Sequence, residues 1–427
     1  MRDLRLSRMV FMATLALLVG STCEVSFVYA QQLRELKLFE GGTESVVLVV
    51  NAALANKISL DQFAKDLGKQ GYTVYEKPFG LTKLPELAIE TQSLVTTPPA
   101  IRSYLAGLYH RTRGHLVGAI LIGDLPHAYQ FVTLVSSNPK IPSLSEEVIS
   151  FQYYADLDGI FESSPGYKSP GNRPFSYDVH SGSMDWEIWI GVLPPYKGDL
   201  TRTAKAINEY FAKNHAYREG KGNLPRSFLE VNEFYKPTNL EEHNFFLHSL
   251  GDGPVAWTPF SNAPSALLYF DSPLWKQTVD QGYSDLSAGV ADFTVVDAHG
   301  SWLSSGKLDI GWVEKNWIRT FFYWSNGCAT GDLDHPVNFL TAVLYSPTSM
   351  VLVAKGTTNN SGGMGTNKNG FFGHNIAATL STGRSFGQAI INHVNVPLLN
   401  GFAESREFHF GTAVVLGDPT LQLRLKE

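Results

Sequence analysis

The run FTVVDAHG, residues 293–300, and the run FFYWSNGC, residues 321–328, decide the fold class of this 427-residue chain. Each is a short apolar stretch that leads through turn-forming residues to a reactive side chain, first His299 and then Cys328. Apolar runs of this length, rich in β-branched and aromatic residues, are typical of strands buried in a parallel sheet. We therefore expect two buried strands whose carboxyl ends present an imidazole and a thiol.

A thiol and an imidazole placed in this way are the components of nucleophilic catalysis by sulfur. The thiolate is the attacking species, and a neighbouring imidazole lowers the pKa of the thiol. The sequence motifs of several other enzyme chemistries are absent. The chain contains no Walker loop, no His-Glu-x-x-His helix and no Cys-x-x-Cys pair. The pattern favours a cysteine peptidase.

The first 30 residues have the composition of a secretory leader. They comprise an arginine-containing start (residues 2–8), an apolar segment too short to cross a bilayer (residues 9–19) and the small-residue cleavage signal VYA (residues 28–30). We expect residues 1–30 to be a signal peptide. The mature protein is then secreted, to the periplasm or the extracellular space, and has no membrane span.

Charge and composition restrict the partners of the mature protein. Removal of the leader takes the formal net charge from −6 to −7, because three arginines leave together with two acidic residues. Mild acidity argues against a nucleic-acid partner. The remaining composition is that of a globular enzyme, with abundant aromatic residues and glycines. We expect protein or peptide substrates and no cofactor required for catalysis.

Cysteine usage singles out one thiol. The chain has two cysteines, and Cys23 belongs to the leader, so the mature protein keeps Cys328 without an intramolecular partner. Exported proteins usually pair the cysteines that they retain. Cys328 is therefore either an apolar filler or a reactive group. Its position after a predicted strand favours the reactive group.

Outside the two catalytic runs, the hydrophobic pattern alternates between strand-like and helix-like segments. The runs 45–50, 72–75 and 117–122 predict buried strands, and the periodic segments between them predict helices. Such alternation is typical of an α/β protein with mostly parallel sheets and helices on both faces. The sequence therefore predicts this architecture.

The chain is expected to form two packed subdomains. Residues 31–220 predict an N-terminal α/β subdomain, and residues 221–427 a C-terminal catalytic subdomain, with the glycine-rich connector 219–223 between them. The first subdomain contains a proline-punctuated, loop-rich insertion at about 127–185. We expect this insertion to run over the surface.

The order of several short motifs resembles the gingipain branch of the caspase-like cysteine peptidases. The matching segments are LIGD (residues 121–124), YYADLDG (153–159), EIWIG (187–191), AHG (298–300), Cys328, MVLVAKGTT (350–358) and LGDPTL (416–421). No single segment is specific, but their common order covers residues 118–423, which is most of the mature chain. The resemblance implies a caspase-like fold and a secreted cysteine endopeptidase.

The same resemblance implies roles for individual residues. Cys328 corresponds to the nucleophile and His299 to the general acid/base, and the reaction passes through a thioester acyl-enzyme. The backbone N–H groups of Gly300 and Cys328 correspond to the oxyanion hole, where a residue without Cβ lets a substrate approach the main chain. Glu187 occupies the position of a carboxylate that orients the histidine, with Asp185 in reserve. The alternative for Glu187 is a charge that faces water.

One position departs from the family pattern. Where relatives tend to have Gly-Arg after the EIWIG strand, this chain has Gly191-Val192. The change leaves the catalytic couple intact, but it puts in doubt whether local packing and specificity are the same. The residue after which a substrate is cut is not evident, although Asp297, Asp332 and Asp334 are candidate acids for binding a basic side chain.

An acidic turn in the insertion suggests a metal site. Asp156 and Asp158, followed by Gly159, resemble the start of a calcium loop, in which oxygen ligands surround a sharp turn. The full twelve-residue pattern is absent. A structural calcium ion on Asp156 and Asp158 is therefore one interpretation, and an aspartate-rich turn without metal is the other.

Other functions stay open on sequence grounds. The chain could be a catalytically inactive caspase-fold binding protein, or a transpeptidase or ligase in which an amine resolves the acyl-enzyme. A carbohydrate-active protein is a further alternative, suggested by six tryptophans beside paired carboxylates. These are Trp186, Trp189, Trp302, Trp312, Trp317 and Trp324. Reactivity of Cys328 separates these possibilities.

Overall fold

A computed structural model describes most of the chain. The described residues are 35–80, 96–134, 144–225, 227–233, 267–270, 278–359, 379–380, 382–395 and 412–424. The expected signal peptide, residues 1–30, lies outside them. Eleven strands of the described residues form one continuous sheet, in the order β1-β3-β2-β4-β10-β19-β18-β17-β13-β11-β12.

The first part of the sheet is built from apolar runs that the sequence predicted as strands. It contains β1 (Leu36–Phe39), β2 (Ser45–Asn51), β3 (Thr73–Phe79), β4 (Leu116–Ile122) and β10 (Trp189–Leu193). β2, β3, β4 and β10 are parallel, and β1 is antiparallel to β3 at the edge. Every residue of β2 is buried, which explains its unbroken β-branched sequence.

The second part of the sheet carries the two apolar runs that lead to His299 and Cys328. It contains β11 (Phe228–Asn232), β12 (Leu267–Phe270), β13 (Phe293–Asp297), β17 (Phe322–Ser325) and β18 (Val353–Thr357), all parallel to one another. β19 (Ala413–Gly417) joins the two parts, because it is parallel to β10 and antiparallel to β18. The carboxyl ends of β13 and β17 therefore lie at the same edge as the start of β10.

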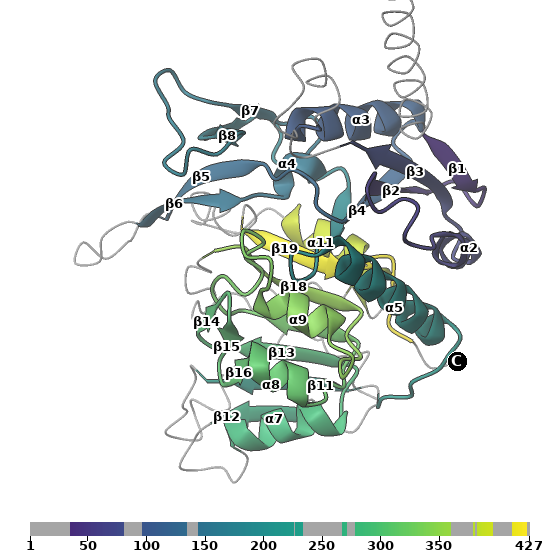
Figure 1. Ribbon diagram of the computed structural model, residues 1–427, viewed down its shortest axis with the longest axis vertical. Coiled ribbons are helices and arrows are strands. Elements are labelled where there is room, and N and C mark those ends of the chain that lie inside the picture. Colours follow the sequence, from purple (N-terminus) through teal and green to yellow (C-terminus); the bar gives the residue numbers. More distant parts are fainter. Residues whose placement is uncertain are drawn as a thin grey trace, which may run out of the picture.

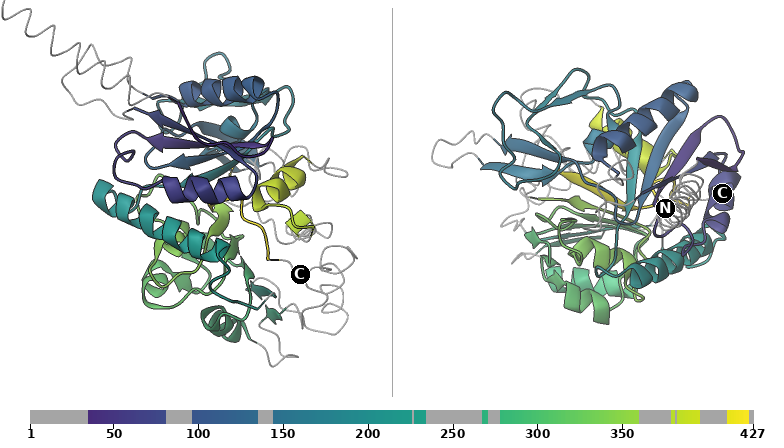
Figure 2. Two further views of the ribbon diagram at one scale, coloured as in Figure 1. Left: turned by 90° about the vertical axis from the view of Figure 1, so that its right-hand side faces the viewer. Right: turned by 45° about the horizontal axis from the view of Figure 1, so that its top comes forward.

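Helices cover both faces of the sheet, as the alternation predicted. In the first part, α3 (Pro98–Arg111) lies over one face and α2 (Asp61–Lys69) over the other (Figure 2). The long helix α5 (Leu200–Arg218) packs against α2 and α9 (Phe339–Tyr345) and leads from β10 to β11 (Figure 1). In the part of the chain that the structure describes, the remaining helices of more than four residues are α7 (Val279–Ala288), α8 (Ile310–Lys315) and α11 (Phe386–Val394). The fold is thus a mixed α/β architecture with a mostly parallel central sheet.

The insertion at 127–185 is more ordered and more buried than its proline content suggested. It forms β5 (Tyr129–Leu134), β6 (Leu144–Ile149), α4 (Gln152–Ala155), β7 (Ile160–Glu162), β8 (Ser176–Tyr177) and β9 (Val179–Ser181). Tyr154 is fully buried and Tyr177 nearly so, in a group of packed aromatic rings with Tyr153 and Phe161. These aromatic side chains belong to the hydrophobic core that also contains the buried residues of the central sheet.

Among the described residues, no helix is both long enough and apolar enough to cross a membrane.

Candidate active site

The strand register brings His299 and Cys328 to the same place. β13 and β17 are parallel neighbours, and Val296 of β13 stands opposite Ser325 of β17. His299 and Cys328 each follow three residues after this pair. Parallel neighbours end at the same edge of a sheet, so the loops that carry the imidazole and the thiol lie beside each other.

Main-chain contact between the two loops is direct at Gly300. A Cβ atom at this position would lie 2.7 Å from the carbonyl oxygen of Cys328 and 2.7 Å from Cα of Gly327. No real side chain tolerates such distances, so only glycine allows the loops to approach so closely. The Gly300 and Cys328 backbones are therefore adjacent, as the predicted oxyanion hole requires.

The side chains of His299 and Cys328 are both at least partly accessible to solvent. His299 is exposed, and its carbonyl oxygen accepts a hydrogen bond of 2.7 Å from the N–H of Gly306. Cys328 is half-buried and carries a thiol. After Cys328 the chain turns sharply, with Ala329 in the left-handed region at φ 54°. A non-glycine residue seldom adopts this conformation, which commonly marks functional turns.

Hydroxyl groups of neighbouring residues fix the Cys328 loop through hydrogen bonds. The carbonyl oxygen of Gly327 accepts hydrogen bonds from Oγ1 of Thr330 at 3.2 Å and Oγ1 of Thr357 at 3.0 Å. Oγ of Ser325 contacts Oγ of Ser305 at 2.9 Å and accepts a hydrogen bond from the N–H of Gly327. These contacts tie the loop to β18 and to the segment that follows His299.

A buried polar network joins the ends of β13 and β17. Nδ2 of Asn326 donates a hydrogen bond to Oδ1 of Asp297, and the N–H of Asn326 donates to the carbonyl oxygen of Val296 at 3.0 Å. Nδ2 of Asn232 lies 3.3 Å from the other oxygen of Asp297. Burial and the adjacent Asp297 carboxylate hold the pKa of Glu230 well above its usual range. Asp297 is only 1% exposed, which rules it out as an acid that contacts a substrate side chain.

The other two candidate acids lie in the loop after Cys328. Asp334 is engaged, because it accepts a hydrogen bond of 2.6 Å from the hydroxyl of Tyr129 and pairs with Arg173. Asp332 is half-buried, and burial raises its pKa. Its Oδ1 accepts a hydrogen bond of 3.0 Å from the N–H of Asp334, and its Oδ2 lies 3.6 Å from Nε2 of His335. Of these two acids, Asp332 is therefore the one whose carboxylate is less strongly bound by neighbouring side chains.

Sequence reasoning missed an aromatic pair beside the site. Trp302 follows the His299 loop and stacks on His335 of the Cys328 loop, with ring centroids 4.1 Å apart and an interplanar angle of 11°. The carbonyl oxygen of Trp302 also accepts a hydrogen bond of 2.7 Å from the N–H of Phe339. No sequence spacing links Trp302 to His335, because the strand register alone brings their loops together.

Glu187 lies just before β10, in a group with Asp156 and Asp158. The carboxylate oxygens of these three residues lie within 4.8 Å of one another. Oε2 of Glu187 accepts a hydrogen bond of 2.5 Å from the N–H of Leu157. Burial raises the pKa of Glu187 to about 7, and the charges of the two aspartates act in the same direction. In the sheet order, β19, β18 and β17 separate β10 from β13.

The structure thus unites residues that the sequence assigned to two separate roles. The expected orienting carboxylate Glu187 stands beside the expected calcium ligands Asp156 and Asp158. Asp156 is fully buried and already accepts hydrogen bonds from the N–H of Gly159 at 2.5 Å and from Nε2 of His180 at 2.8 Å. Asp185, the reserve candidate, is exposed. Both Asp185 and Glu187 precede the strand, because β10 begins at Trp189.

Two other sequence features belong to the packing. Trp186, Trp189 and Trp324, half of the tryptophans that suggested carbohydrate binding, are buried.

The pattern Gly-x-Ser-x-Gly occurs at residues 383–387, which sequence reasoning overlooked. Its serine, Ser385, is buried, and its hydroxyl accepts a hydrogen bond from the N–H of Gln388 at the start of α11. Ser385 is therefore a helix cap.

Comparison with solved structures supports the fold. The chain is similar to the crystal structure of the Arg-specific cysteine proteinase gingipain R, with 14% sequence identity, a TM-score of 0.58, and coverage of 91% of this chain and 80% of that chain. It is also similar to a protease structure, with 12% identity, a TM-score of 0.55, and coverage of 90% of this chain and 79% of that chain. No protein-family model matches the chain, and no curated protein matches its sequence.

The likeness covers nearly the whole chain, and it confirms the predicted fold class. This protein has a gingipain-like fold of the caspase type.

Proposed function

We propose that this protein is a secreted cysteine endopeptidase in which Cys328 is the nucleophile and His299 the general acid/base. The observation that carries the proposal is the main-chain contact between Gly300 and the Gly327–Cys328 peptide. This contact places an exposed imidazole loop against a thiol loop, at the edge of a sheet whose fold is similar to that of a cysteine proteinase. Protein or peptide chains are the expected substrates.

In the proposed reaction His299 takes the proton of the Cys328 thiol, and Sγ attacks the carbonyl carbon of the scissile peptide. The N–H groups of Gly300 and Cys328 are proposed to donate hydrogen bonds to the oxyanion of the tetrahedral intermediate. The imidazolium then gives its proton to the leaving amine, and a thioester acyl-enzyme remains. Water, activated by the neutral imidazole, hydrolyses the thioester and restores the thiol.

Two secondary parts of the proposal concern the group of Glu187, Asp156 and Asp158. Glu187 is proposed to orient His299, although its described contacts are with Leu157 and the two aspartates. The same three carboxylates fit a structural calcium ion, because clustered carboxylate oxygens are the ligands that Ca²⁺ prefers. Neither part is needed for the chemistry of the couple.

The test of the proposed function is the loss of peptide hydrolysis in Cys328→Ala. We expect turnover of an unstructured protein substrate to fall at least about a thousandfold, because the nucleophile is lost. The thermal unfolding midpoint should change little, because the half-buried thiol contributes little packing. Retention of more than about a hundredth of wild-type turnover would contradict the assignment.

A second variant separates a catalytic couple from an inert thiol. His299→Ala should slow the reaction of Cys328 with iodoacetamide at pH 6.5 by at least about tenfold, because the imidazole no longer favours the thiolate. His335→Ala is the matched control, since it removes another imidazole near the site. Equal labelling in wild type and His299→Ala, without turnover, would indicate an inactive binding protein. Product analysis with an added amine distinguishes hydrolysis from transpeptidation.

A further inference from the structure

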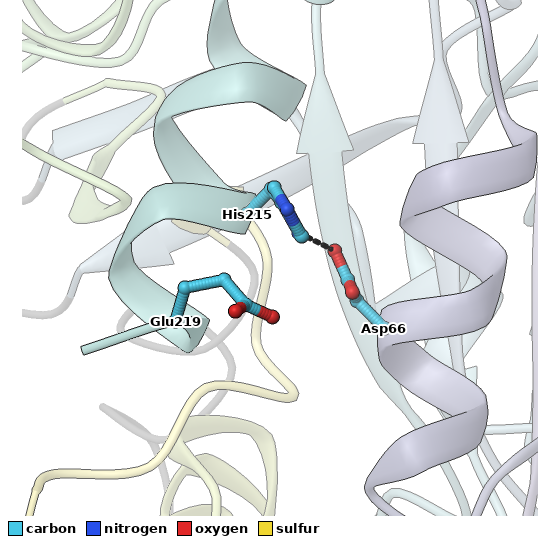
Figure 3. Close-up of side chains that lie close together, drawn as sticks. All are labelled: Asp66, His215 and Glu219. Atoms are coloured by element: carbon cyan, nitrogen blue, oxygen red, sulfur yellow. Dashed lines mark hydrogen bonds and ion pairs between the residues drawn. The ribbon is translucent and has the colours of Figure 1, made fainter. Parts of the chain in front are cut away.

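A second group of potential metal ligands lies far from Cys328 in the sequence, between helices α2 and α5. Asp66 belongs to α2, His215 to the last turn of α5, and Glu219 directly follows α5 (Figure 3). One ligand atom from each residue lies within 4.8 Å of the other two. Nδ1 of His215 lies 2.8 Å from Oδ2 of Asp66. The group therefore joins two helices that are distant in sequence.

The surroundings of this group favour a cation. All three residues lie at the carboxyl ends of their helices, where unsatisfied carbonyl groups carry partial negative charge. Nζ of Lys69 already lies 3.4 Å from Oε1 of Glu219 and 3.9 Å from Oδ1 of Asp66. The Lys69 side chain is 65% exposed, so it can move into solvent at little cost.

The carboxylate of Asp66 is held so that one of its oxygens faces His215. Its side chain is 2% exposed, and its Oδ1 accepts a hydrogen bond of 2.9 Å from Nε2 of Gln62. This bond orients the carboxylate, so that Oδ2 faces His215. His215 is 34% exposed and Glu219 is 45% exposed, which leaves the outer side of the group open to water.

We propose that Asp66, His215 and Glu219 bind one divalent transition cation of the Zn²⁺ class. One imidazole and two carboxylates suit Zn²⁺ better than Ca²⁺, which prefers oxygen ligands alone. The metal takes the place of the proton that His215 shares with Asp66, and a water molecule completes the tetrahedron. Ligand atoms around such a metal are about 3.3 Å apart, so Nδ1 and Oδ2 need to separate only slightly.

A metal here would connect the two parts of the sheet. α2 packs on β1 and β3 in the first part, whereas α5 leads into β11 of the second. A cation bound by Asp66 of α2 and by His215 of α5 would oppose the separation of the two helices. Bound Zn²⁺ would therefore raise the thermal unfolding midpoint in proportion to the logarithm of its concentration.

The test uses zinc titration by calorimetry in the Cys328→Ala background, because a reactive thiol is itself a zinc ligand. We expect one equivalent of Zn²⁺ to bind, with affinity at least about tenfold lower in Glu219→Gln and in His215→Ala. Glu209→Gln is the matched control, since Glu209 is another exposed acid of α5, and its ion-pair partner among the described residues is Lys205. It should leave the affinity unchanged.

Lys69→Met gives the decisive comparison, because it removes the competing ammonium. The proposal expects tighter zinc binding in this variant than in its parent. Zinc binding that persists in both Glu219→Gln and His215→Ala would overturn the proposal, and so would the absence of saturable binding below about 1 mM in Lys69→Met. Glu219 is partly exposed, so its variant remains informative if His215→Ala does not fold.

Discussion

At the scale of single residues, Gly300 has the most direct influence on the candidate site. It follows the proposed general base and touches the proposed nucleophile's main chain, so its missing side chain determines how closely the two loops meet. The atoms that a Cβ would meet are backbone atoms of Gly327 and Cys328, which cannot rotate away as a flexible side chain could.

Gly300→Ala should therefore lower kcat/KM by at least about a hundredfold, because separation of the loops by even 1 Å misplaces the oxyanion donors. The steady-state kinetics of a peptide substrate measure this effect. Gly107→Ala is the control, because a Cβ at this position in α3 would meet only the end of the Arg111 side chain, at 3.9 Å. The control should keep full activity and be slightly more stable. Equal activity of the two variants would show that the contact at Gly300 is not required.

Glu187 allows a prediction about pH. Its pKa in the folded protein is about 7, above the ordinary glutamate value, because it is buried beside Asp158 and Asp156. Between these two values the folded state binds more protons than the unfolded state, so stability falls as pH rises from about 4.5 to 7. In the presence of EDTA, Glu187→Gln should lose less stability than wild type over this window. Urea unfolding at pH 5 and pH 8 measures the difference, and parallel losses would contradict the raised pKa.

The same variant tests whether Glu187 orients His299. If it does, Glu187→Gln should lower kcat strongly and leave KM nearly unchanged, since the imidazolium is stabilised only as charge develops. Asp185→Asn is the matched control two residues earlier. A loss confined to Asp185→Asn would transfer the role to the aspartate. No loss in either variant would leave a Cys328/His299 dyad.

At the scale of elements, the pairing of β13 with β17 determines the geometry of the couple. The hydrogen bond from Asn326 to the buried Asp297 joins the two strands at the point where they leave the sheet. Since His299 and Cys328 each follow this bond by two residues, it limits how far the two loops can shift relative to each other.

Asn326→Ala should cost about 2 kcal/mol or more of unfolding free energy, because a buried carboxylate loses a donor. It should also slow iodoacetamide labelling of Cys328, as the two loops lose their common register. Asn316→Ala is the matched control, because Nδ2 of Asn316 donates to a neutral acceptor, the carbonyl of Trp312, at 2.9 Å. Unfolding in urea and labelling kinetics measure the two effects. Unchanged labelling in Asn326→Ala would show that the bond serves stability alone.

At the scale of the whole molecule, the central sheet buries charged groups near the site. Lys355 lies in β18 and is 4% exposed, with its ammonium 4.5 Å from the ring centre of Trp324. Burial lowers the pKa of Lys355 to about 7, although the charge of Asp297 opposes the shift. The middle of the sheet is thus a place where pH changes the stability of the entire fold.

The sign of this dependence follows from proton binding. Between pH 7 and about 10.5 the unfolded chain binds the lysine proton and the folded protein does not, so stability rises with pH across this window. Lys355→Met should reduce this rise and be more stable than wild type at pH 6, by a few kcal/mol. Part of the rise should remain, because burial lowers the pKa of Lys213 to about 7 as well. Urea unfolding at pH 6, 7.5 and 9 tests the expectation. A variant whose stability follows the wild-type curve would show that Lys355 remains charged when folded.

The amino-acid sequence by itself determined the class of fold, and it singled out His299 and Cys328 as the pair to test. Apolar runs such as 45–50 and 117–122 have few alternatives to a buried parallel strand, and a thiol after one such run stands out without any tertiary information. The insertion at 127–185 was harder to predict, because its prolines and glycines are local signals. The aromatic packing that buries Tyr154 is not local.

Only the tertiary structure decided which residues share a site. Periodicity carries no information about strand order, so the sequence did not place β19 between β10 and β18. It likewise did not link Asp297 to Asn326, Glu187 to the acidic turn at Asp156, or Asp66 to His215. Each of these contacts joins residues far apart in the chain, and their proximity depends on how the parallel strands and their crossover helices pack. Local propensities specify the elements, whereas packing specifies their neighbours.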